Sequence, residues 1–427
     1  MYRFLVAVLF CSCVLSIYAA QSDPASTVSR NAQQAASSRS GASPSLEELR
    51  LSARHSWTQG KIDQAAKQYR EVLELSEKSG QADAHVAADL YANGSLSVEM
   101  DRLSDAQAYF RRALDRVRNQ PLLEAEVRMS MGALLGLEGN FPEAEGNLKS
   151  AIAGFTKHAG PNDLRTAKAW NTLAWVYSAW GSMDHAGAAL DQAQSIVQRG
   201  LPSDSIERIP FLDYHAEYLT QIGRYTEAEK LWRQALEIAE QSLGQMSTQF
   251  DAVLLHMGRM YSSIGDYKSA QEALERFLSI EKTAMPGGSL SQAVALGELG
   301  NTYAHLGDHS QAEPTLAKSI DMLRTIPGNV PLADALVGTY LGDYYMTQQR
   351  WSDAADQYRQ ALQTRQELIP NTPLVAGSMS ALSRALEKLK RKVEAKRYRK
   401  QAEAILSEQH NPFFRGDTVD VKSLQRR

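Results

Sequence analysis

Cysteine is almost absent from this chain of 427 residues, which contains only Cys11 and Cys13. Both lie in the first 20 residues, MYRFLVAVLFCSCVLSIYAA, where a single arginine precedes an apolar run and small residues end the segment. This layout is typical of a secretory signal peptide, which we expect to be cleaved after Ala20. Its removal would leave no cysteine and so exclude disulfides, thiolate catalysis and cysteine metal ligands. We therefore expect an exported protein, periplasmic or secreted.

Two alternatives stay open for this first segment. The apolar run at residues 4–17 is short for a membrane span, but left uncleaved it would anchor the chain. One of the two cysteines could instead carry a lipid. After removal of the segment we expect no stable membrane span.

Large apolar residues are almost lacking from residues 21–45, which are rich in serine, alanine and glutamine. Such a segment buries too little apolar surface to offset the entropy lost on ordering. It is predicted to be a disordered linker between the signal and the folded part.

Strong charge of one sign is also lacking, since the net charge is -3. The whole-chain balance therefore indicates no nucleic-acid partner. Enzyme signatures are missing too, because the sequence has no phosphate-binding G-x-x-x-x-G-K-[ST], no G-x-S-x-G and no H-E-x-x-H. We predict no catalytic residues, no cofactor and no metal.

One histidine pair needs separate consideration as a metal site. His305 and His309 are four residues apart, a spacing that suits a metal when both lie on one helix. Gly307 and Asp308 place a turn between them, which favours two solvent-facing turn residues. An enzyme is the least favoured class of function.

What the sequence does have is a repeat. The stretches IGRYTEAEKLWRQAL, IGDYKSAQEALERFL and LGDHSQAEPTLAKSI contain Gly223, Gly265 and Gly307, which lie 42 residues apart. An alanine marks the same register in nine successive segments: Ala65, Ala106, Ala144, Ala186, Ala228, Ala270, Ala312, Ala354 and Ala395. A fixed period in this range is the signature of a repeat architecture.

Each repeat is predicted to be two amphipathic helices joined by a tight turn. Four residues after each alanine stands a bulky side chain on the same helical face, except for Arg399 in the ninth unit. Upstream of each turn a small residue lies seven places before the glycine, and a tyrosine follows it in several units, as in AWNTLAWVYSAWG. No segment alternates strictly, so the fold class is all-α.

This pattern resembles the tetratricopeptide repeat (TPR). Trp170, Leu173, Ala174, Tyr177 and Gly181 follow the family's order in one unit. The 42-residue period is similar to that of the kinesin-light-chain variant. The resemblance implies a right-handed superhelical solenoid of about nine repeats over residues 46–408, with a C-terminal tail at residues 409–427.

The resemblance also implies a concave groove lined by the first helix of each unit, which binds a protein or peptide. The family's groove positions correspond here to Arg50, Arg54, Tyr91, Met129, Asn171, Trp175, Asp213, Glu217, Arg259, Asn301 and Asp343. Tyr91, Met129 and Trp175 would form an apolar anchor patch, since aromatic side chains dominate binding hot spots. The alternative is that Trp175 packs against the neighbouring unit as core.

The resulting expectation is an exported, non-enzymatic scaffold that binds a peptide or protein partner. The alternative is an accessory subunit of cell-envelope assembly, export or polysaccharide handling, whose array contacts glycan. Both roles require only a binding groove, so the sequence does not distinguish them.

A basic run closes the array. From Arg384 to Lys400 there are nine Lys and Arg residues against Glu387 and Glu394. The run could contact an anionic membrane or nucleic acid. It is also explained by the polar outer face that the last unit of a solenoid requires.

Overall fold

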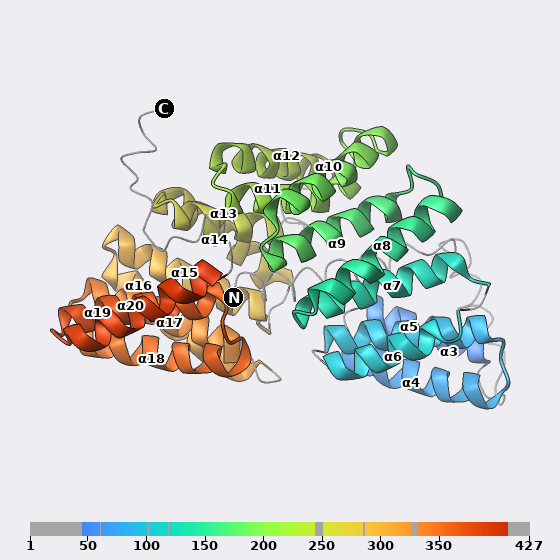
Figure 1. The fold of residues 1–427 in the computed structure, drawn as a ribbon, viewed down its shortest axis with the longest axis horizontal. Coiled ribbons are helices and arrows are strands. Elements are labelled where there is room, and N and C mark those ends of the chain that lie inside the picture. Colours follow the sequence, from blue (N-terminus) through green and yellow to red (C-terminus); the bar gives the residue numbers. More distant parts are fainter. Residues whose placement is uncertain are drawn as a thin grey trace. The chain divides into compact units, whose positions relative to one another are not determined.

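The computed structural model describes residues 45–408 except 60, 101, 118, 244–250, 285–286 and 327–330. The predicted signal peptide and tail lie outside the described residues, as does all but the last residue of the predicted linker. The described helices form two compact units, divided between Gly200 and Leu201. Figure 1 draws the helices in chain order, from blue at α3 to red at α20.

The N-terminal unit consists of four helix pairs. Its helices are α3 (Leu46–Thr58), α4 (Ile62–Lys78), α5 (Asp83–Glu99), α6 (Leu103–Leu114), α7 (Pro121–Leu137), α8 (Phe141–His158), α9 (Leu164–Trp180) and α10 (Met183–Gly200). Helix α3 begins with a capping box, in which the Ser45 side chain accepts the Glu48 N–H and the Glu48 carboxylate accepts the Ser45 N–H. The two helices of each pair pack on one another, and consecutive pairs of this unit are joined by contacts of α4 with α5, α6 with α7 and α8 with α9.

The C-terminal unit consists of five further pairs preceded by a short 3-10 helix. Its elements are η1 (Ile206–Arg208), α11 (Ile209–Gln221), α12 (Tyr225–Leu243), α13 (Asp251–Ser263), α14 (Tyr267–Ala284), α15 (Leu290–Leu306), α16 (His309–Thr325), α17 (Pro331–Thr347), α18 (Trp351–Leu368), α19 (Pro373–Lys388) and α20 (Lys392–Glu408). No strand occurs among the residues described in either unit, so the prediction of an all-α array of helix pairs is confirmed.

The turns within the pairs explain the spaced glycines. Gly181, Gly223, Gly265 and Gly307 have φ between 79° and 89°, in the left-handed region that glycine enters without a steric penalty. The N–H of the following residue donates to a carbonyl of the last helical turn, as Asp308 does to Tyr303. Each glycine thus ends the first helix and starts the return of the second.

The register alanines and the bulky residues four places later lie where the two helices of a pair cross. All nine alanines are buried, and so is every bulky residue at that position from Tyr69 to Tyr358. Several first helices place a glycine opposite: a Cβ on Gly94 would lie 2.5 Å from the Phe110 ring, and one on Gly342 would lie 2.6 Å from Tyr358. A bulky side chain therefore fills the space that a missing side chain leaves. The burial of both residues agrees with their predicted place on one helical face.

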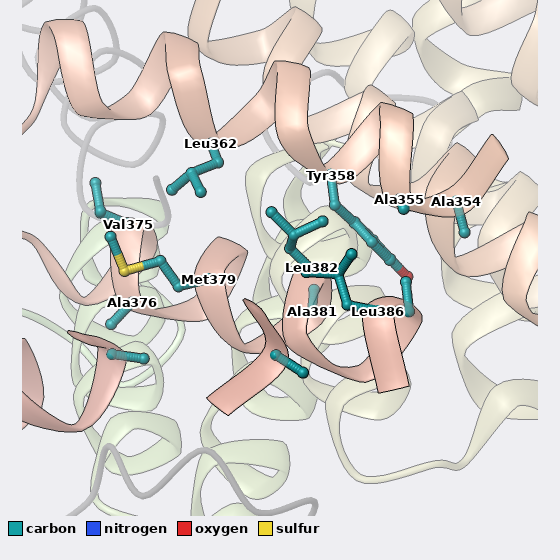
Figure 2. Packing of buried hydrophobic residues seen from close by; sticks show 13 residues of the cluster. Ala354, Ala355, Tyr358, Leu362, Val375, Ala376, Met379, Ala381, Leu382 and Leu386 are labelled. Atoms are coloured by element: carbon teal, nitrogen blue, oxygen red, sulfur yellow. The ribbon is translucent and has the colours of Figure 1, made fainter. Parts of the chain in front are cut away.

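The last pairs share one apolar core. Tyr358 of α18 lies beside Leu382 and Leu386 of α19 (Figure 2). Ala395 and Ala402 attach α20 to the same cluster. Arg399, the exception in the ninth unit, is exposed, as a final helix without a following pair allows. None of the described helices is both long and apolar enough to cross a membrane.

Candidate functional site

The predicted partner-binding residues all lie on the first helices of the pairs, from α3 to α17. Six belong to the N-terminal unit: Arg50, Arg54, Tyr91, Met129, Asn171 and Trp175. Five belong to the C-terminal unit: Asp213, Glu217, Arg259, Asn301 and Asp343. The chemistry of the two sets is different, so each unit is described by itself.

In the N-terminal unit, the predicted anchor patch of Tyr91, Met129 and Trp175 is largely buried between helices. Met129 is buried, and Trp175 is only 6% exposed. The Trp175 ring lies over Gly136 of α7, where an added Cβ would come within 2.7 Å of it. Tyr91 is half-buried, and its hydroxyl lies 3.3 Å from Ser130 Oγ. The burial of Trp175 against α7 agrees with the alternative that this ring packs as core, and Met129 is enclosed as well. That these residues contact a partner stays a prediction.

The polar residues of this unit connect consecutive first helices. Arg50 of α3 donates to both carboxylate oxygens of Asp89 in α5, at 2.9 Å from Nε and 2.8 Å from Nη2. Arg54 is half-buried one turn further along α3. Asn171 of α9 is 4% exposed, and its Oδ1 accepts no hydrogen bond from the described part of the chain.

In the C-terminal unit, the structure brings together Asp213 and Glu217 of α11 with His256 of α13. His256 Nδ1 lies 2.9 Å from Asp213 Oδ1, and Nε2 lies 3.4 Å from Glu217 Oε1. The Trp232 indole also donates to Asp213, at 2.6 Å. Burial disfavours the imidazolium, but the two carboxylates outweigh it and raise the pKa of His256 to about 9. His256 is therefore a buried cation at neutral pH.

A second group of buried polar contacts links α13 to α15 and α17. Arg259, one turn after His256 on α13, places Nε 3.4 Å from Glu298 Oε2 of α15. The Tyr340 hydroxyl of α17 donates to the same Glu298 oxygen at 3.3 Å. Burial raises the pKa of Glu298, whereas the Arg259 charge lowers it. We call Asp213, Glu217, His256, Arg259 and Glu298 the charged row.

The two remaining predicted residues lie beyond this row. Asn301, one turn after Glu298, is half-buried, and its Oδ1 receives no hydrogen bond from any described residue. Asp343 of α17 accepts a 2.5 Å hydrogen bond from the Tyr358 hydroxyl, and burial raises its pKa. The structure therefore joins Asp213 and Glu217 through His256, pairs Arg259 with Glu298, and places Asp343 in a separate contact.

Sequence reasoning missed a recurring bond between consecutive pairs. Tyr177 donates to Glu145 at 2.7 Å, and Tyr261 donates to Glu229 at 2.8 Å. Each tyrosine lies four residues before a turn glycine, and each glutamate directly follows a register alanine of the preceding pair. The tyrosines stand out in the repeat pattern, and the fixed position of the glutamates after the register alanines is the signal that could have revealed their partners.

The histidine pair does not converge on a metal. The His305 ring stacks on Tyr267 with centroids 4.5 Å apart, while His309 lies 2.8 Å from the Gln348 amide nitrogen. Within the described part of the chain, no three His, Cys, Asp or Glu side chains are placed to hold an ion. Both rings are engaged in contacts with neighbouring helices.

Comparison with known families agrees with this architecture. Profiles of the tetratricopeptide repeat match residues 167–196, 211–283, 249–325 and 341–402. The chain is a tetratricopeptide repeat protein. The matches fall in the units where the sequence pattern is strongest. The comparison with curated proteins found no match.

Solved structures extend the likeness in fold. The quorum sensor NprR from B. thuringiensis, in its apo form, matches this TPR protein with a TM-score of 0.57 and 15% identity, over 84% of this chain and 98% of that chain. A Rap protein complexed with competence and sporulation factor matches with a TM-score of 0.56 and 16% identity, over 86% and 99%. Kinesin-light-chain TPR-like repeats from Podosopora anserina match with a TM-score of 0.41 and 21% identity, over 49% and 100%.

Proposed function

We propose that this TPR protein is an exported, non-enzymatic scaffold that binds a protein or peptide along the first helices of its repeats. The repeat fold is typically a non-catalytic scaffold for protein interaction. Two proteins that share the fold are a quorum sensor and a Rap protein solved with a bound factor, and both fit a role in ligand binding. Export is inferred from the signal-like first segment of the sequence.

The observation that carries the proposal is a pair of incompletely satisfied amides. Asn171 and Asn301 both lie at positions that the repeat resemblance assigns to the partner. Each has a buried Oδ1 that accepts no hydrogen bond within the described residues. A buried acceptor without a donor costs about 1–3 kcal/mol, which folding alone does not favour. An N–H group of a bound peptide would remove that cost once the neighbouring first helices part to admit it.

The test begins with affinity capture by the chain from residue 21, followed by titration of the identified partner into purified variants. We expect Asn171→Ala and Asn301→Ala to weaken binding about tenfold each while leaving the melting temperature unchanged or slightly raised. Asn147→Ala is the control, since Asn147 is half-buried on a second helix, α8, and donates to the Glu143 carbonyl of the same helix. Unchanged affinity in both test variants would contradict the proposal.

A second candidate, an accessory role in cell-envelope assembly or polysaccharide handling, rests on one exposed ring. Trp180 at the end of α9 is 43% exposed and stacks on Phe141 of α8, with centroids 5.8 Å apart and planes 18° from parallel. Such a supported aromatic face suits apolar ring faces, including those of sugars. Binding of envelope polysaccharide that Trp180→Ala abolishes would favour this candidate over the peptide scaffold.

A further inference from the structure

The last described pair carries the basic run on a surface that no further described pair covers. Helix α20 packs on α19 through Ala395 and Ala402, so its opposite face points away from the core. A polar outer face is what a terminal repeat requires, but it does not require a surplus of one charge. Some of the cations in the run nevertheless form contacts within the fold.

One cation has a structural role shared with the preceding pair. Arg391 donates to both carboxylate oxygens of Glu394, at 2.7 Å each. Arg350 makes the equivalent contact with Asp353 at the start of α18. This pairing belongs to the start of a second helix, so the Arg391 charge is used by the fold itself.

Two more cations are committed to contacts with neighbouring helices. Arg399 forms an ion pair with Glu387 of α19. The Lys388 ammonium lies 5.7 Å from the Trp351 ring centroid. These contacts hold α20 and α19 in place and account for the two side chains.

Six cations remain, Arg384, Arg397 and four lysines, and the lysines lie at the outer face and the turn that leads to it. Lys392, Lys396 and Lys400 are exposed and lie four residues apart, on one face of α20. Lys390 is exposed in the turn before them. Val393 lies beside these lysines and is 86% exposed, the most exposed of the large hydrophobic side chains in the described part of the chain. We call these five residues the basic tip.

The backbone at Lys390 is also unusual. Its φ is +62°, at the turn position where Gly265 and Gly307 stand in earlier pairs. A lysine is strained in this conformation, whereas glycine is not. Gln349 holds the same conformation in the preceding pair, so the turn accepts a side chain there, and Lys390 adds a positive charge beside the outer face.

We propose that the basic tip binds the surface of an anionic lipid membrane. The four lysines would lie against lipid phosphates, to which each basic side chain near the surface is attracted. Val393 would enter the boundary between head groups and acyl chains, where an apolar side chain is favoured. The exposed valine decides against nucleic acid, because an aliphatic side chain gains little from a phosphate backbone. The proposal is independent of partner binding by the first helices, since it uses only residues 390–400.

The test is co-sedimentation of the chain from residue 21 with vesicles of phosphatidylcholine alone or mixed with phosphatidylglycerol. We expect binding to the mixed vesicles only, weakening as salt is raised. Lys392→Gln and Lys396→Gln should each lower the partition coefficient about fivefold, and Val393→Asn about threefold. Equal binding to both kinds of vesicle, or none to either, would overturn the proposal.

A matched pair of glycine variants separates binding from folding. Lys390→Gly removes a charge and relieves the backbone, so it should raise the melting temperature and still lower vesicle binding about fivefold. Gln349→Gly relieves the same backbone conformation in the preceding pair, where φ is +57°, without changing the charge. It should raise the melting temperature and leave vesicle binding unchanged. Equal binding by the two variants would count against the tip as the lipid contact.

Nucleic acid supplies the competing outcome. An oligonucleotide that binds the chain with the same dependence on Lys392 and Lys396, but is insensitive to Val393→Asn, would replace the lipid assignment. Binding to mixed vesicles that the valine variant weakens, with no binding of the oligonucleotide, supports it.

Discussion

The first helices of the two units fill corresponding positions with opposite chemistry. In the N-terminal unit, Met129 and Trp175 close the space between consecutive first helices with apolar side chains. In the C-terminal unit, Glu217, His256 and Glu298 occupy that kind of space with charge. The repeat thus fixes where helices cross and which positions are enclosed, but leaves open whether those positions hold apolar contacts or ion pairs.

The largest expected effect is in the apolar unit. Trp175→Ala should lower the free energy of unfolding of the N-terminal unit by about 3–5 kcal/mol, because the ring is enclosed above Gly136 and leaves a cavity. Denaturant unfolding measures this. Trp180→Ala, which removes an exposed ring five residues later, is the control and should change it by about 0.5 kcal/mol or less. Similar losses in both variants would mean that Trp175 is not enclosed.

The charged unit should respond to the loss of one ion-pair partner. Arg259→Met leaves the buried Glu298 without its cation and should cost about 3 kcal/mol. The double variant Arg259→Met with Glu298→Met should recover most of that stability, since apolar residues can replace a buried pair without loss. A double variant as unstable as the single one would show that the charged row is needed for more than mutual neutralisation.

A pH dependence should distinguish the two units. The pKa of His256 is about 9 in the folded protein against 6.5 for the free side chain. Its charged form therefore stabilises the C-terminal unit fully below pH 6.5, and this contribution is lost as the pH rises through 9. The loss should be about 2–3 kcal/mol by pH 10. Melting curves of the His256→Gln variant should lack this alkaline transition, and a wild-type curve that is flat over the same range would refute the charged histidine.

The smallest effect should be the same in both units. Tyr177→Phe removes one hydrogen bond between consecutive pairs, and Tyr261→Phe removes the equivalent bond and a 3.4 Å bond from Arg233. Each variant should cost about 1 kcal/mol. Burial and the bond to Glu229 raise the pKa of Tyr261 to about 12, so its hydroxyl stays a donor at ordinary pH. Spectrophotometric titration measures the tyrosine pKa, and thermal melts measure the loss of stability. A large cost in one unit alone would show that the bond has a different role in each.

The helix pairs, the turns and the crossing residues could be predicted because they depend on spacing within a single repeat. Ala228 and Trp232 stand at a fixed distance from Gly223, and the physics of a helix crossing determines their burial. The environment of Trp175 could not be predicted in the same way. It depends on how closely α7 approaches α9, which Gly136 decides from another repeat. His256 was missed because its charge depends on contacts with two carboxylates that stand 43 and 39 residues earlier in the chain.

The complementary fit of Gly94 to Phe110, and of Gly342 to Tyr358, lies inside one repeat, whereas the tyrosine–glutamate bonds pass from one repeat to the next. A gene segment that encodes one period therefore carries its own crossing with it when it is duplicated or lost. The tyrosine–glutamate bonds to the neighbouring repeats form only if the recombined gene keeps the spacing between a register alanine and the following turn glycine. Recombination can change the length of this array in whole periods, and a break at any other phase separates a tyrosine from its glutamate.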